Sequence, residues 1–231
     1  MKLRPSQVRL PRRGVLVFGG SDFERVRRAI RGKRFAWSEW EAVGHAGPHR
    51  LFVGRSHIGG PGAAIVLEEA SVRGVRDWIT FGACGSLRAD LPIGSVVIPT
   101  FAVPDEGTSV HYGAPRRPRP DPTLVAAIQR ACERRGLPFR KGGVWTTDAP
   151  YRESRAKARA LAKQGVLGVE MEAASAYAVA RHSGLRAASL FVVSDELGGA
   201  GWNPGFRDER FARAKHTAID ALVDAIARPW R

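Results

Sequence analysis

The chain has 231 residues, 44% of them hydrophobic and 26% charged, a composition typical of a globular protein and not of a disordered or fibrous one. Its formal net charge of +15 at pH 7 is compatible with a nucleic acid, a membrane surface or an anionic small molecule as partner. The basic residues lie in short clusters, as in 25–34 and 116–119, with little aromatic interleaving, so we interpret them as solvated faces and do not expect a nucleic-acid footprint.

Short apolar runs alternate with longer helical patterns along the chain, which indicates a mixed or mostly parallel β-sheet flanked by helices. The expected strands are residues 14–18, 51–54, 77–81, 95–99, 143–146, 167–169 and 188–193. The expected helices are residues 21–30, 63–72, 123–135, 153–164, 172–182 and 208–227. We therefore predict a single α/β domain over residues 1–231, with a mixed central sheet and residues 1–13 as an N-terminal extension.

Glycine-rich turns follow three of the expected strands, at the edge of an α/β sheet where ligands gather. The first turn leads into a helix with capping-box spacing between Ser21 and Glu24, so Gly20, Ser21 and Arg25 are candidates for holding an anion. Judged alone, this segment fits a plain glycine turn with a solvated arginine equally well. The other two turns, residues 59–62 and 82–86, leave room for a ligand beside the backbone, although a bulge in the sheet explains the latter as well.

Carboxylates appear abruptly where two apolar segments end. Asp195 follows Ser194 at the end of the run 188–193, a position that favours a proton donor working near neutral pH. The alternative is that Asp195 only caps a loop. Glu170 and Glu172 begin a small-residue helix, and their spacing of two directs them to different faces, so only one of them points into a shared site.

Together these segments resemble the nucleoside phosphorylase family, which includes purine nucleoside phosphorylase, uridine phosphorylase and the methylthioadenosine nucleosidases. The matching pieces occur in the family's order and extend over roughly residues 14–227; they are Ile58-Gly59-Gly60-Pro61, Gly82-Ala83-Cys84-Gly85-Ser86-Leu87, Asp105-Glu106-Gly107-Thr108-Ser109, Thr146-Thr147-Asp148, Val169-Glu170-Met171-Glu172-Ala173 and Val193-Ser194-Asp195.

The resemblance implies a role for each matching residue. Glu172 accepts hydrogen bonds from the ribose 2′- and 3′-hydroxyls, Met171 packs on the sugar, and Asp195, held by Ser194, protonates the departing purine at N7. As the bond breaks, the sugar gains oxocarbenium character and the base gains electrons, so both groups favour the transition state. Further candidates for the substrate are Glu170, Cys84 and Gly85, with Tyr151 or Trp145 stacking on the base unless they belong to the core. The resemblance also implies that the co-substrate phosphate binds at Arg25, Gly20, Ser21 and Ala83. Neither a metal nor another cofactor is expected.

Two departures from the family leave the reaction open. Family phosphorylases have an arginine and, three residues later, a serine or threonine for phosphate, where this chain has Thr80 and Ala83. The alternative to a phosphorylase is a hydrolytic nucleosidase, with Asp22 activating water; a second alternative is a non-catalytic protein that binds nucleosides or nucleic acid.

The glutamine and arginine with which the uridine enzymes bind uracil have no match after Tyr151, which favours a purine as the base. The family implies a homo-oligomer, a dimer or a hexamer.

Two further features bear on the compartment. The only cysteines, Cys84 and Cys132, have neither metal-site nor disulfide spacing, which favours a reducing cytosol and two small buried side chains. No apolar stretch has the length of a signal peptide or a membrane span. We expect a cytoplasmic protein.

Overall fold

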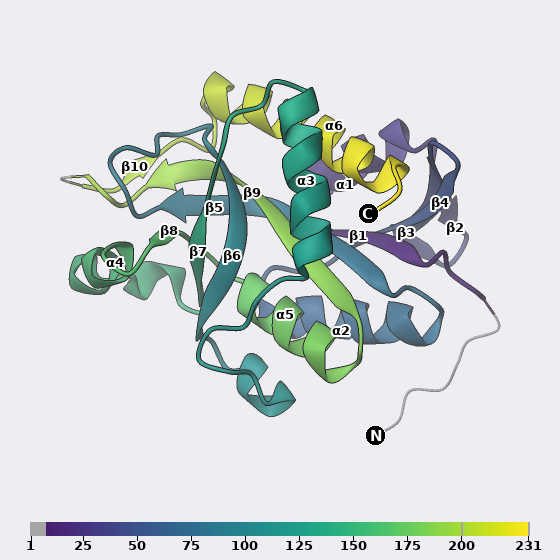
Figure 1. The fold of residues 1–231 in the computed structure, drawn as a ribbon, viewed down its shortest axis with the longest axis horizontal. Helices are drawn as coiled ribbons and strands as arrows, with labels where there is room; N and C mark the ends of the chain where they lie inside the picture. Colours follow the sequence, from purple (N-terminus) through teal and green to yellow (C-terminus); the bar gives the residue numbers. More distant parts are fainter. Residues whose placement is uncertain (1–7, 200, 231) are drawn as a thin grey trace.

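The computed structural model describes residues 8–199 and 201–230, and these form a ten-stranded mixed sheet with helices on both faces (Figure 1). The strands are β1 (Arg13–Val17), β2 (Lys33–Phe35), β3 (Ser38–Ala46), β4 (His49–Arg55), β5 (Asp77–Ser86), β6 (Val96–Asp105), β7 (Phe139–Thr147), β8 (Val166–Glu170), β9 (Arg186–Glu196) and β10 (Asn203–Pro204). The α-helices are α1 (Gly20–Ala29), α2 (Gly60–Val72), α3 (Pro122–Arg134), α4 (Arg155–Ala162), α5 (Ala173–His182) and α6 (Glu209–Ala227), and the short 3₁₀ helices are η1 (Ser109–Tyr112) and η2 (Pro150–Arg152).

The sheet closes on itself over part of its width. Its strand order is β10-β9-β6-β7-β8-β5-β1-β4-β3-β2, and β9 also pairs with β5. The strands β9, β6, β7, β8 and β5 therefore form a closed ring, from which β1, β4, β3 and β2 extend as an open sheet. Because β1 is parallel to β4 and β5, and β5 is parallel to β9, the carboxyl ends of these four strands lie at one edge.

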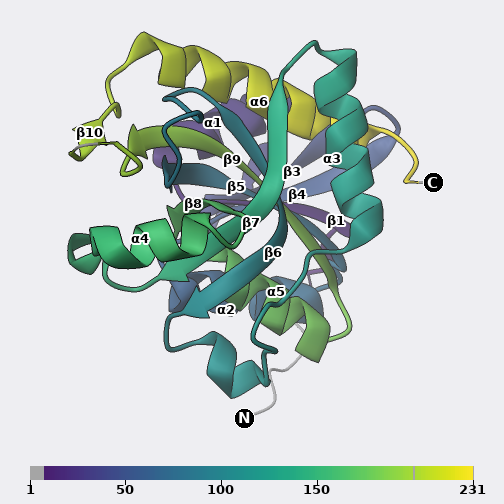
Figure 2. The ribbon, with the colours of Figure 1, turned by 60° about the vertical axis from the view of Figure 1, so that its left-hand side comes forward.

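Two hydrophobic cores hold the helices against the sheet. Helices α1, α3 and α6 bury side chains such as Phe23, Ile128 and Leu222 in one core, and α2 and α5 bury side chains such as Leu67 and Val179 in the other. Figure 1 shows these two helix groups on opposite faces of the sheet. Helix α4 packs separately beside β8 (Figure 2), where Leu161 and Val166 share a smaller cluster.

The predicted fold class is confirmed, with differences at the ends of elements. The capping box expected at Ser21 and Glu24 is wrong: Gly19 is the N-cap of α1 and makes no side-chain cap bond, and Glu24 instead pairs with Arg27. The strands β2 and β3 were not expected, because the segment is largely exposed and lacks a continuous apolar run. Cys84 and Cys132 are both free and buried, as predicted.

The N-terminal segment joins the sheet before the boundary set for the extension. Leu10 is buried, and its N–H donates to the carbonyl of Arg73 at 2.8 Å. Arg13 already belongs to β1. Residues 1–7 lie outside the described residues. In the described part of the chain, no helix combines the length and the apolar character needed to cross a membrane.

Candidate active site

Asp195 lies at the carboxyl end of β9, where it is buried to 8% exposure. Its Oδ1 accepts a hydrogen bond of 2.7 Å from the Ser194 hydroxyl, and its Oδ2 accepts one of 2.8 Å from the Trp202 indole N–H. The Ser194 hydroxyl also lies 3.3 Å from the Cys84 carbonyl. A carboxyl group with both oxygens engaged is held in one orientation, at the rim of a buried strand.

A β-bulge shapes the strand next to Asp195. The register between β5 and β9 shifts between Cys84 and Gly85, and after the shift Gly85 faces Asp195. A Cβ atom at position 85 would lie 3.0 Å from Asp195 Oδ2 and 2.6 Å from a methyl carbon of Leu197. The carboxylate therefore approaches the β5 backbone closely because Gly85 has no side chain, and the structure brings Ser194, Cys84 and Gly85 together around Asp195.

The two carboxylates of the Val169–Ala173 segment have different partners. Glu170 Oε2 accepts the N–H groups of Glu172 at 2.8 Å and Ala173 at 2.7 Å, while its Oε1 accepts the Thr146 hydroxyl. Glu172 is the N-cap residue of α5, and its Oε1 accepts the Gly59 N–H at 2.7 Å. Glu170 thus fastens the start of α5, whereas Glu172 reaches across to the turn before α2. Met171, between them, is half-buried.

Burial shapes the acid–base chemistry of this pair. Desolvation raises the pKa of Glu170, against the opposing effect of its three hydrogen-bond donors. Desolvation and then the neighbouring charge of Glu170 raise the pKa of Glu172, again against the Gly59 N–H. Further hydrogen-bond donors, such as the hydroxyls of a sugar, therefore stabilise the ionised form of the buried Glu172 carboxylate.

Sheet topology places Asp195 and the glutamates on either side of one strand. Gly85 of β5 pairs with Asp195 of β9 on one side and with Val169 of β8 on the other. Cys84 lies between them: burial raises the pKa of its thiol, and the charges of Glu170 and Asp195 raise it further. Asp195 and Glu170 therefore both lie near Cys84 of β5.

The turn after β1 lies at the same edge and carries the candidate anion residues. Gly20 begins α1, Ser21 is exposed, and Arg25 is half-buried with its Nη2 3.8 Å from Asp220 Oδ1. Ala83 is the one exposed position in the otherwise buried strand β5, so its methyl group faces open space. Thr80, at the position of the family arginine, is fully buried and donates its hydroxyl to Ser189 at 2.7 Å.

Asp22, the candidate water activator, is buried, and its Oδ1 lies 2.6 Å from Lys215 Nζ of α6. The pair borders a cavity of about 750 Å³ between α1 and α6, which Ser21, Arg25, Phe206 and Asp220 also line. The contact joins α1 to α6.

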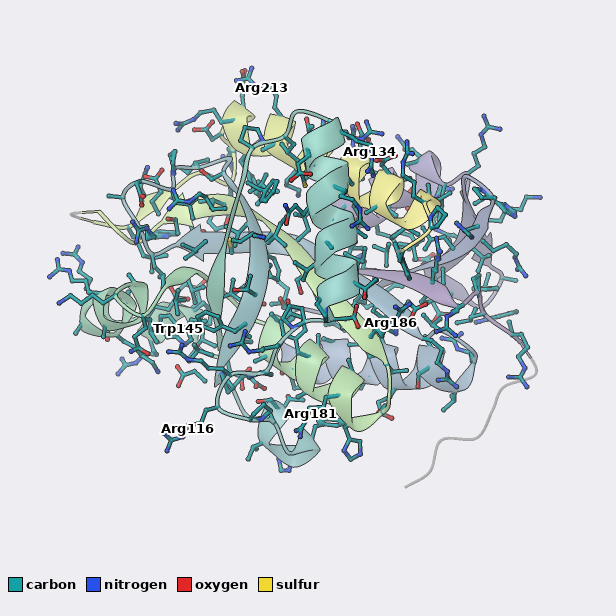
Figure 3. All side chains as sticks on the ribbon, viewed as in Figure 1. Arg116, Arg134, Trp145, Arg181, Arg186 and Arg213 are labelled. Atoms are coloured by element: carbon teal, nitrogen blue, oxygen red, sulfur yellow. The ribbon has the colours of Figure 1, made fainter. Side chains whose placement is uncertain are left out.

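The two aromatic candidates for the base differ in burial. Trp145 is 1% exposed, packs in the cluster beside α4 (Figure 3), and donates its indole N–H to Asp105 at 3.0 Å. It therefore belongs to the core, the alternative given above. Tyr151 is 98% exposed on η2 and makes no aromatic contact in the described part of the chain.

Two residues near Asp195 were not singled out from the sequence. Trp202 bonds to it directly, and Glu153 lies close enough that burial and then the charge of Asp195 raise the pKa of Glu153 to about 7. Trp202 follows a glycine-rich segment with no periodic pattern, so no signal marked it. Glu153 had a weak signal, since it follows Tyr151, a candidate for stacking on the base, by two residues.

The remaining family segments stabilise the loops around this edge. Glu106 Oε2 accepts the N–H groups of Thr108 at 2.7 Å and Ser109 at 3.0 Å, and Asp148 accepts the Gly107 N–H at 2.9 Å. No group of three histidine, cysteine or carboxylate side chains suited to a metal ion occurs within residues 8–199 and 201–230.

Comparison with known proteins identifies the family. The family model described as the phosphorylase superfamily matches residues 17–228. The chain is 34% identical to a DeoD-type purine nucleoside phosphorylase of Myxococcus xanthus over 84% of both chains. It is 37% identical to a guanosine phosphorylase of Halorubrum lacusprofundi, over 61% of this chain but only 58% of that relative.

The fold agrees as well. The chain superimposes with a TM-score of 0.85 on a purine nucleoside phosphorylase from Toxoplasma gondii, solved in complex with immucillin-H. That match covers 98% of this chain and 97% of the other at 19% identity. On the strength of the family match and the Myxococcus relative, this chain belongs to the phosphorylase superfamily.

Proposed function

We propose that the protein is a nucleoside phosphorylase, which cleaves the N-glycosidic bond of a purine nucleoside with phosphate to give the free base and ribose 1-phosphate. The observation that carries this proposal is that Gly85 of β5 pairs with Asp195 of β9 on one side and with Val169 of β8 on the other, and that β8 leads through Glu170 to Glu172 at the start of α5. The site then has a proton donor for a leaving base and an acceptor for sugar hydroxyls. Phosphate enters beside Gly20, Ser21, Arg25 and Ala83.

Each residue has one task in this reaction. Glu172 accepts hydrogen bonds from the 2′- and 3′-hydroxyls, and Met171 packs on the sugar. A phosphate oxygen bonds to C1′ as the bond from C1′ to the base breaks, and the bonding electrons pass to the base. Asp195 gives its proton to N7 of the purine, which lets the base leave uncharged. General-acid assistance of this kind contributes about 10²- to 10⁴-fold to the rate.

The purine preference has two supports. Both relatives named above are phosphorylases of purine nucleosides by name. In addition, a proton donor at this edge suits N7, a basic atom that pyrimidines lack. Glu153, half-buried near Asp195, belongs on the base side of the site.

Hydrolysis is the alternative suggested by Thr80 and Ala83, but the ion pair between Asp22 and Lys215 leaves the proposed base for water already engaged. A polyanion-binding role is also less well supported, because Arg116, Arg134, Arg181, Arg186 and Arg213 lie on different sides of the molecule (Figure 3). We further propose that the enzyme is a cytoplasmic homo-oligomer, a dimer or a hexamer, and that it requires phosphate but no other cofactor.

The test is a panel of purine and pyrimidine nucleosides, each incubated with and without inorganic phosphate. The proposal expects base release from purine nucleosides only when phosphate is present, with ribose 1-phosphate as the second product. Release at an undiminished rate without phosphate supports the hydrolase instead. RNA binding with a steep salt dependence and no base release supports the non-catalytic alternative.

A further inference from the structure

Arg55 is an unassigned cation next to the turn that carries the candidate phosphate residues. It is the last residue of β4 and pairs with Val17, the last residue of β1. A Cβ atom at position 20 would lie 3.3 Å from Arg55 Nη1 and 3.4 Å from Cζ. The guanidinium therefore lies against the first residue of α1, in the space that a side chain at position 20 would fill.

Neighbouring arginines have carboxylate partners, whereas Arg55 has none recorded in the described residues. Arg27 pairs with Glu24, and Arg73 pairs with Glu41. The Arg55 Nε atom is buried without a hydrogen-bond acceptor. A buried N–H without an acceptor costs free energy, so such a group in a native structure calls for a ligand or water.

An aromatic ring holds the Arg55 guanidinium in place. Its Cζ lies 4.7 Å from the centre of the Trp40 ring, and the His57 ring packs edge-on against Trp40 at 4.5 Å. Stacking on one face leaves the N–H groups in the guanidinium plane free to bind an anion. The arginine is thus oriented in advance.

The backbone beside Arg55 offers further donors. Gly19 caps α1 without a side-chain bond, and the N–H groups of the first helical turn have no acceptor within the helix. The positive end of the helix dipole points to the same place. Since Gly20 lacks a Cβ atom, an anion at the N-terminus of α1 reaches both the N–H groups of the first helical turn and the Arg55 guanidinium.

We propose that Arg55 binds the phosphate co-substrate and replaces, from a different strand, the family arginine that is absent at Thr80. The inference rests on the proposed function. Thr80 is not free for that task, because its hydroxyl donates to the buried Ser189. Arg25 and Arg55 then provide the two guanidinium groups of the phosphate site.

The test compares Arg55→Gln and Arg55→Lys with Arg50→Gln. Arg50 is an exposed residue on the same strand, so its substitution removes an equal charge elsewhere. Two quantities are measured: the phosphate and nucleoside KM values, and the rise of Tm caused by inorganic phosphate without nucleoside. Loss of a charge-assisted contact predicts that Arg55→Gln raises the phosphate KM at least about tenfold, leaves the nucleoside KM within about twofold and removes most of the phosphate-induced rise in Tm.

The two variants differ in what they retain. Lysine keeps the charge but not the planar fork, so Arg55→Lys gives an intermediate phosphate KM, and Arg50→Gln behaves as wild type. Phosphate KM values and Tm rises equal to wild type in both Arg55 variants would overturn the proposal. If Arg55→Gln does not fold, as judged by circular dichroism, Arg55→Lys decides by the same criterion.

Failure of the proposed function is separable from failure of this inference. A wild-type protein that cleaves no nucleoside refutes the proposed function. The phosphate-induced rise in Tm still tests Arg55 in that case, because it requires no turnover. A wild-type protein whose Tm does not respond to phosphate overturns the assignment of Arg55.

Discussion

Replacing Asp195 with asparagine isolates the proton from the shape of the side chain. The Trp202 N–H can only donate, whereas the Ser194 hydroxyl can also accept. The asparagine carbonyl therefore turns to Trp202 and its amide to Ser194, and both contacts of 2.7 and 2.8 Å keep a donor and an acceptor. We expect the Tm of Asp195→Asn to stay within about 2 °C of wild type, since a satisfied polar pair replaces a satisfied polar pair.

The substitution Asp195→Asn is expected to lower kcat. An amide cannot protonate N7, so kcat for inosine falls by about 10²- to 10⁴-fold, equivalent to about 2.7–5.5 kcal/mol of activation free energy. The inosine KM changes by less than about threefold, because the contact with the base is retained. The assay is base release at saturating phosphate, with Asp90→Asn as the control, since Asp90 is an exposed aspartate.

A nucleoside methylated at N7 sharpens the experiment. Its base leaves without needing a proton at N7, so Asp195→Asn and wild type should turn it over at similar rates. A variant that keeps the wild-type kcat for inosine would refute the acid role. Equal losses on inosine and on the N7-methylated nucleoside would also refute it, because a general disturbance of the site predicts that result.

Three further predictions concern charges near the site. Because the pKa of Glu172 is raised by burial and then by the charge of Glu170, nucleoside affinity measured by calorimetry without phosphate should rise between about pH 6 and pH 9, and Glu172→Gln should remove this rise. The pKa of Glu153 is raised to about 7, so ionisation of Glu153 destabilises the folded state as the pH increases towards 7. Glu153→Gln should therefore raise Tm more at about pH 8 than at about pH 5. An equal rise in Tm at both pH values would contradict this prediction. Asp22→Asn leaves Lys215 unpaired and should lower the free energy of unfolding in urea by about 1–3 kcal/mol with phosphorolysis retained, whereas a water-activating Asp22 predicts lost activity.

Strand pairing brings the predicted site residues Asp195 and Gly85 together. Asp195 and Glu172 each follow an apolar strand, and the parallel pairing of β5 with β9 brings the end of β9 beside Gly85. The adjacent strand β8 brings in the glutamates. Periodicity was sufficient to predict the α/β fold and the strand that ends at Asp195, since both depend on local patterns and on the topology of α/β sheets.

Contacts between distant side chains could not be predicted in the same way. Trp145 was a candidate for stacking on the base, yet it is 1% exposed because it packs under α4 and bonds to Asp105. Trp202 has no apolar neighbours in sequence and still donates to Asp195. The partner of an indole N–H depends on how loops fold over the sheet, which no short pattern encodes.

The pair Glu170 and Glu172 shows how two similar side chains acquire different roles. The first helical turn of α5 leaves N–H groups without intrahelical acceptors, and Glu170 accepts two of them. That contact fixes the backbone at position 172, where Glu172 is the N-cap and its carboxylate extends to Gly59. The Glu172 carboxylate has backbone donors from Gly59 and Met171, whereas three donors occupy Glu170, so Glu172 retains more capacity for sugar hydroxyls. A carboxylate that binds a substrate with two hydroxyls needs two free acceptor sites, and with about four sites per carboxylate Glu172 keeps about two whereas Glu170 keeps about one.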